Sequence, residues 1–196
     1  MDILRRCAVP VLWLALVVQV GWVLLNEFVL GRSPGLGWLG VVALVSMGAL
    51  GVVRRGAAVE WVELVARIVV AAQFLNAVAD RFGVWGPPGT GGVAWGNYDS
   101  FVGFTRQISL FLPEWTAPVL AHAATVGELV LGVGLLVGVW VRWVALGAGV
   151  LLVSFGVSMS ISLPPEQQFS YSVFLLASGM FVVASGVRRG SRSGLG

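Results

Sequence analysis

Six long apolar runs dominate this sequence and leave little chain for anything else. They cover residues 8–30, 36–53, 61–80, 118–139, 143–162 and 168–187. A bilayer core roughly 30 Å thick is crossed by an α-helix of about 20 apolar residues, so each run is long enough to span. Because strict two-residue alternation is absent, helices are favoured over a membrane barrel. The sequence predicts an all-α fold, a polytopic membrane helical bundle of about six transmembrane helices.

The composition agrees with a membrane protein and excludes several other classes. Of the 196 residues, 58% are hydrophobic and 11% are charged, which is too apolar for a soluble domain of this length. The arginines form short clusters between apolar runs rather than one basic face, so nucleic acid is excluded as a partner and the lipid bilayer is expected. A single cysteine, Cys7, rules out an internal disulfide, and a single histidine rules out bis-histidine haem or a multi-histidine metal cage. The sequence identifies no cofactor and no metal site.

The distribution of arginines predicts the orientation of the bundle. Arg5 and Arg6 precede the first run, which lacks a cleavage site and is interpreted as an uncleaved signal anchor. A cytoplasmic N-terminus places Arg54, Arg55, Arg142, Arg188, Arg189 and Arg192 on the same side, and Arg32, Arg81 and Arg106 on the other. The positive-inside rule then predicts a multi-pass protein of the cell (plasma) membrane with both termini in the cytoplasm.

Three regions follow from this arrangement. Residues 1–56 are expected to form a two-helix membrane hairpin, residues 57–187 a four-helix core, and residues 188–196 a disordered cytoplasmic tail. The core contains one long outer loop, 81–117, which is rich in glycine and proline at its start.

The second half of this loop predicts a short amphipathic helix on the outer face. Four apolar side chains fall at helical spacing there: Phe101, Phe104, Ile108 and Phe111. Asn97 or Asp99 is available as an N-cap and Pro113 as a stop.

Ionisable residues inside the apolar runs are costly and therefore need partners. Glu63 and Arg67 are one helical turn apart in the third run, and Glu128 lies in the fourth. Glu63 and Arg67 can therefore pair along one helix face, and because the two runs are antiparallel, Arg67 can also pair with Glu128 across the helices. This intramembrane ion pair is interpreted as a structural device that holds the helices in register.

A second polar cluster lies nearer the outer surface and is the candidate substrate-binding site. Gln73, Asn76 and Asp80 share one helix face, and His122 is expected at similar depth on the facing helix. A polar pocket under an aromatic loop suits a small molecule or proton transfer. The alternative is that Asp80 is an interface residue and that His122 packs against its own helix. No catalytic residue is assigned.

Two segments resemble a known family. They are WVELVARIVVAAQFLNAVADRFG and GELVLGVGLLVGVWVRW, and an apolar helix follows them. In these features, residues of about 60–187 resemble the DoxX family of small four-helix membrane proteins, which is related to the DoxD subunit of thiosulfate:quinone oxidoreductase. The resemblance carries over onto Arg67, Glu128 and Arg142, and onto Asn76 and Asp80, and it implies a DoxX-like four-helix core in a quinone-linked or thiol-stress setting.

The favoured function is therefore a membrane subunit of a quinone- or sulfur-linked oxidoreductase system. A quinone or a small sulfur compound would bind near Asn76, Asp80 and His122, with a redox partner subunit alongside. Whether the chain is itself an enzyme stays open. The alternatives are a non-enzymatic membrane scaffold, which docks a partner protein through the outer helix and the cytoplasmic arginines, and a small-molecule carrier.

Overall fold

The computed structural model describes residues 2–31, 38–53, 58–164, 169 and 171–186, and within these ranges it is helical without a strand. The helices are α1 (Asp2–Leu24), the π-helical turn η1 (Leu25–Val29), α2 (Trp38–Val52), α3 (Ala58–Arg81), α4 (Tyr98–Ile108), α5 (Thr116–Val137), α6 (Val141–Ser162) and α8 (Val173–Ser185). The predicted all-α membrane bundle is confirmed. The predicted tail, 188–196, lies outside the described residues.

Four helical segments within the described ranges are long and apolar enough to cross a membrane: Arg6–Val29, Ala58–Arg81, Thr116–Val137 and Val141–Ser162. The other two apolar helices, α2 and α8, have 15 and 13 residues. At 1.5 Å per residue they measure about 22 and 20 Å, less than the roughly 30 Å of a bilayer core. The predicted runs 36–53 and 168–187 are thus represented, within the described residues, by helices shorter than the other four. In α8 the reason is local, because the left-handed residues Ser172 and Gly186 flank the helix.

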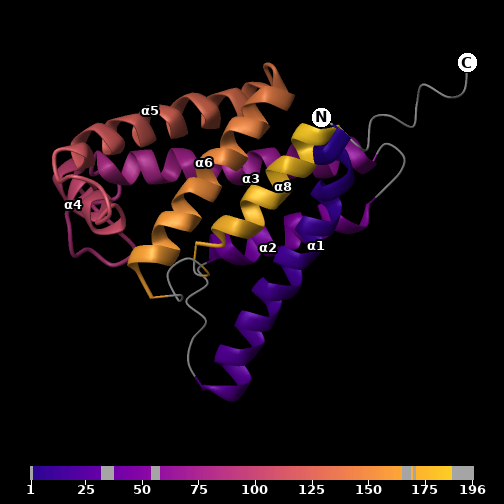
Figure 1. Ribbon diagram of the computed structural model, residues 1–196, viewed down its shortest axis with the longest axis horizontal. Helices are drawn as coiled ribbons and strands as arrows, with labels where there is room; N and C mark the ends of the chain where they lie inside the picture. The colour runs from indigo at the N-terminus through magenta and orange to yellow at the C-terminus, as the bar shows by residue number, and fades with distance from the viewer. Residues whose placement is uncertain (1, 32–37, 54–57, 165–168, 170, 187–196) are drawn as a thin grey trace, which may run out of the picture.

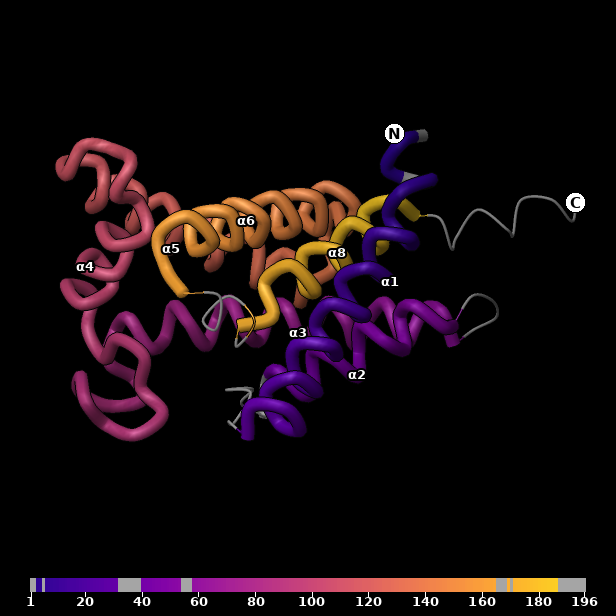
Figure 2. The backbone as a smooth tube through the Cα atoms, turned by 60° about the horizontal axis from the view of Figure 1, so that its bottom comes forward, coloured from indigo at the N-terminus to yellow at the C-terminus, as the bar shows by residue number. Residues whose placement is uncertain are grey.

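The long helices lie alongside one another, and α4 sits at one end of them. Figure 1 shows α3 and α5 running side by side, with α4 at the end where the chain passes from one to the other. Figure 2 shows the start of α1 and the end of α8 together at the opposite end. The orientation in the membrane stays a prediction, because most arginines that carry it lie outside the described residues: Arg32, Arg54, Arg55, Arg188, Arg189 and Arg192.

One hydrophobic core joins the first two helices to the rest. Within it α1 packs mainly on α8, and α2 mainly on α3. Gly179 of α8 permits close packing on α2, since a Cβ there would meet Met47 Sδ at 2.1 Å. Gln19 is buried in α1 and donates to the Phe169 carbonyl oxygen at 3.0 Å, beside the stacked rings of Trp22 and Phe169. The N-terminal helices are thus part of the same packed body.

The amphipathic helix predicted in the long loop is present as α4. Asn97 is its N-cap, and its side-chain oxygen accepts from the Ser100 N–H at 2.7 Å. Phe101 and Ile108 are buried, whereas Phe111 is exposed because the helix ends at Ile108, before Pro113. The apolar face of α4 packs on α5 and α6 and so is already covered by the protein itself.

Candidate functional site

A cavity of about 670 Å³ lies at the end of the bundle where α4 sits. Seven of the side chains that line it are aromatic: Phe74, Trp85, Trp95, Phe101, Phe104, Phe155 and Tyr171. Six lining residues carry a polar side chain: Gln73, Asn76, Asp80, Arg81, Glu128 and Tyr171. The cavity therefore combines an aromatic wall with a small number of polar groups, most of them from the last turns of α3.

Asp80 attaches the following loop to the end of α3. Its Oδ2 accepts from the backbone N–H of Ala94 at 3.2 Å and of Trp95 at 2.8 Å. Its Oδ1 is buried and has no hydrogen-bond partner. Since Trp85, Ala94 and Trp95 all line the cavity, this carboxyl group fixes the loop that forms one of its walls.

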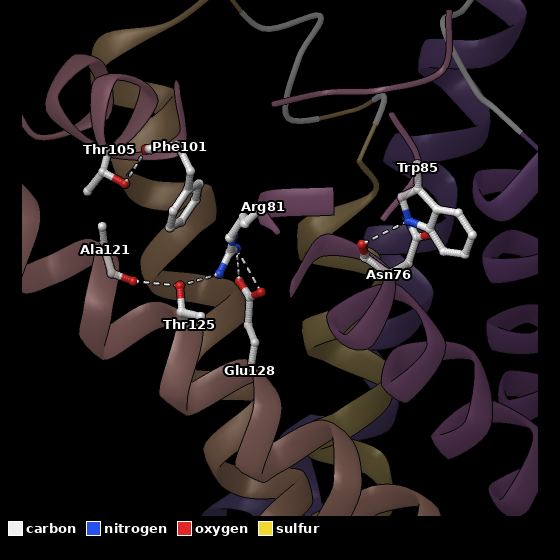
Figure 3. A network of polar contacts seen from close by, with 8 residues as sticks. All are labelled: Asn76, Arg81, Trp85, Phe101, Thr105, Ala121, Thr125 and Glu128. Atoms are coloured by element: carbon white, nitrogen blue, oxygen red, sulfur yellow. Dashed lines mark hydrogen bonds and ion pairs between the residues drawn. The ribbon is translucent and has the colours of Figure 1, made fainter. Parts of the chain in front are cut away.

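Arg81, the next residue, binds α5 instead. Its Nη2 lies 2.8 Å from Glu128 Oε1 and 2.7 Å from Oε2, and its Nη1 donates to Thr125 Oγ1 at 2.9 Å. The guanidinium carbon is 3.5 Å from the centre of the Phe101 ring, a cation–π contact with α4. Figure 3 shows this group enclosed by Phe101, Thr125 and Glu128. One buried arginine thus links α3, α4 and α5.

The predicted ion pair between Arg67 and Glu128 is wrong. Glu128 pairs with Arg81, whereas Arg67 donates to the carbonyl oxygen of Leu135 from Nε at 3.1 Å and from Nη2 at 2.6 Å. Leu135 lies seven residues further along α5, about 10.5 Å from Glu128 along the axis. Arg67 therefore stabilises the C-terminal turns of α5, where carbonyl groups lack helical partners. Glu63 is also buried in α3.

The error arises from the register between α3 and α5. In the first turns of α5, Ala121 and Ala124 pack against Phe101 of α4. This places Glu128 level with the end of α3, and the side chain of Arg81 leans back toward it, as helical side chains lean toward the N-terminus. Sequence reasoning missed Arg81 as a site residue, although a buried glutamate in α5 required a cation near it.

The other predicted site residues divide into two groups. Gln73, Asn76 and Asp80 line the cavity together, as their spacing on one helix face suggests. The Trp85 indole N–H points to the Asn76 carbonyl oxygen at 3.5 Å, the limit of a hydrogen bond (Figure 3). His122 does not line the cavity. It is exposed on α5, its Nδ1 is 2.8 Å from the Pro118 carbonyl oxygen, and its ring meets Tyr98 edge-on.

Unpartnered buried polar atoms gather around this cavity. Besides Asp80 Oδ1, they include Gln73 Nε2 and Arg81 Nε. Buried polar atoms without partners are uncommon in folded proteins and call for an occupant such as water or a ligand. Among the described residues, no group of three His, Cys, Asp or Glu side chains is placed to hold a metal ion.

Comparison with known proteins agrees with the helical core. The family model of DoxX matches residues 62–160, half of the chain, from the first turns of α3 to the end of α6. The match includes the cavity-lining turns of α3, the loop, α4 and Glu128. Comparison with curated proteins and with solved structures finds no match. The arrangement of apolar helices and the family match lead to one conclusion, that this helical membrane protein belongs to the DoxX family.

Proposed function

We propose that the protein is a membrane subunit of an oxidoreductase system and that its cavity binds a quinone. The observation that carries the proposal is the cavity at the end of α3, about 670 Å³ in volume, with an aromatic wall and few polar groups. Small-molecule sites commonly have volumes of about 300–1,000 Å³ and the same kind of lining. A quinone ring is flat and apolar, and it carries oxygen atoms at opposite edges, so both features suit it.

The charges around the cavity favour a neutral ligand over an anionic sulfur compound. Among the described residues that line it, the basic side chain is Arg81, and Asp80 and Glu128 are acidic. The Arg81 guanidinium is already paired with Glu128 at 2.7 Å, so it offers no uncompensated positive charge to an anion. Thiosulfate would have to enter beside the Asp80 carboxylate, whereas a quinone brings no charge.

The redox setting comes from the family. DoxX proteins are related to the DoxD subunit of thiosulfate:quinone oxidoreductase, which supports a quinone-linked role beside a redox partner. The scaffold alternative is less favoured, because the apolar face of α4, which would have been its main docking surface, packs on α5 and α6. A carrier would use the same cavity, and it would move its ligand across sealed vesicles without any change of oxidation state.

The proposal is tested by filling the cavity. Ala77 lines it on α3, and Ala72 lies on the same helix but is exposed and outside the lining. In protein reconstituted in lipid nanodiscs, Ala77→Phe should weaken binding of menadione by about five- to 150-fold, since overpacking costs about 1–3 kcal/mol. Quenching of tryptophan fluorescence reports the binding, because Trp85 and Trp95 line the cavity.

Ala72→Phe is the matched control, with the same substitution on the same helix, and should bind menadione as the unaltered protein does. Equal affinity in the two variants would place any bound quinone outside the cavity. Lack of menadione binding by the unaltered protein, or saturable thiosulfate binding in its place, would reject the ligand class.

A further inference from the structure

We infer that the cavity binds the reduced, hydroxyl-bearing form of its ligand more tightly than the quinone form, through the free oxygen of Asp80. This inference rests on the proposed function, because it takes the ligand of the cavity to be a quinone.

The carboxyl group of Asp80 has two oxygen atoms in different situations. Oδ2 is occupied by the N–H groups of Ala94 and Trp95, and Oδ1 has no hydrogen-bond partner although the residue is only 3% exposed. An ionised carboxylate only accepts hydrogen bonds. A ligand oxygen at this position is therefore held when it carries a hydrogen and repelled when it is a bare carbonyl oxygen.

Gln73 supplies the complementary group on the same helix face. Its Nε2 is a buried amide donor without a partner, and the residue lines the same cavity two turns before Asp80. Seven residues of helix separate the two Cα atoms by about 10.5 Å along the axis, and with a hydrogen bond of about 2.8 Å at each end a ligand of about 5 Å fits between side chains that project straight from the helix. That space suits one six-membered ring with oxygen atoms at opposite edges.

Gln73 and Asp80, at the two ends of the site, differ in whether they distinguish the quinone from the reduced form. An amide N–H donates equally well to a carbonyl or to a hydroxyl oxygen, so Gln73 holds both forms of the ring. Asp80 accepts from the hydroxyl form alone, and hydrogen bonds to a charged group are among the stronger ones. The preference for the reduced form therefore comes from Asp80.

Such a preference changes the redox behaviour of the bound ring. Tenfold tighter binding of the reduced form raises the two-electron reduction potential of the bound quinone by about 30 mV relative to free quinone. The bound quinone would then accept electrons from a partner more readily than free quinone does.

The substitution Asp80→Asn tests this directly. The asparagine carbonyl can still accept from the loop N–H groups, but its amide nitrogen replaces Oδ1 and donates where the carboxylate accepted. Binding of menadione and of its quinol, menadiol, is measured anaerobically by tryptophan quenching in nanodiscs. The unaltered protein should bind menadiol at least about tenfold more tightly, and Asp80→Asn should bind menadione at least as tightly as menadiol.

A second variant keeps the test decisive if Asp80→Asn does not fold. Gln73→Glu replaces the amide donor by an acceptor of the same shape, so it should weaken menadione more than menadiol and enlarge the preference. Equal or tighter binding of menadione by the unaltered protein, or a preference that neither variant alters, would overturn the inference and leave the quinone site in place. Failure of both forms to bind would instead reject the proposed function.

Discussion

Replacing Arg81 with leucine should lower the free energy of unfolding by about 3–5 kcal/mol, the usual cost of breaking a buried ion pair. The side chains of Arg81 and Glu128 are 1% and 3% exposed, so the carboxylate that is left behind is poorly solvated. The substitution also removes the contact of the guanidinium with Phe101, worth up to about 2 kcal/mol when desolvated, and the hydrogen bond to Thr125. These terms share one side chain and do not add, so the upper limit stays near 5 kcal/mol.

The coupling between the two residues is measured with a double-mutant cycle. Adding Glu128→Leu removes the carboxylate that Arg81→Leu leaves unpaired. The doubly substituted protein should therefore be more stable than Arg81→Leu alone, by about 2 kcal/mol or more. Unfolding is followed by tryptophan fluorescence in mixed micelles of increasing dodecyl sulfate content.

Arg67 provides the matched control for this cycle. It is an arginine buried in the same helix, but it donates to the Leu135 carbonyl oxygen. Arg67→Leu and Glu128→Leu should therefore be additive within about 0.5 kcal/mol. Strong coupling of Glu128 to Arg67, or additivity with Arg81, would refute the assignment of the ion pair.

Two glycines give further predictions. Gly179→Ala should cost about 1–3 kcal/mol in the same unfolding assay, because its Cβ would lie 2.1 Å from Met47 Sδ, and Met47→Ala should recover part of the loss. Gly96→Ala should lower menadione affinity about tenfold, since Gly96 has φ +70° and a Cβ there would lie 2.5 Å from the backbone nitrogen of Pro88, which displaces the cavity loop. Gly91→Ala, in open space in the same loop, should leave the affinity unchanged, and an equal loss in both variants would contradict this reasoning.

Features that depend on one segment at a time were predictable from the sequence. The apolar runs gave the positions of the helices, because a bilayer requires a minimum apolar length whatever the neighbours do. The N-cap at Asn97 follows from local chemistry, and the shared face of Gln73, Asn76 and Asp80 follows from the helical period alone. Whether those three residues bind a ligand stays a prediction.

Features that depend on the register between two packed helices were not predictable. From the sequence alone, either Arg67 or Arg81 could pair with Glu128. The packing of α4 against the first turns of α5 sets the register in which Arg81 is the partner. The same displacement leaves His122 beside Tyr98 and away from the cavity. No periodicity in either helix encodes such an offset, because it depends on the volume of side chains from a third segment.

The packing of α1 on α8 has a consequence for synthesis. Gln19 finds its acceptor at Phe169, 150 residues later in the chain. At about 5–20 residues per second, the first helix must wait roughly 8–30 s before its partner is made. During that time the Gln19 side-chain amide has no native acceptor. We therefore expect the nascent first helix to stay bound to the insertion machinery until the last helix is synthesised.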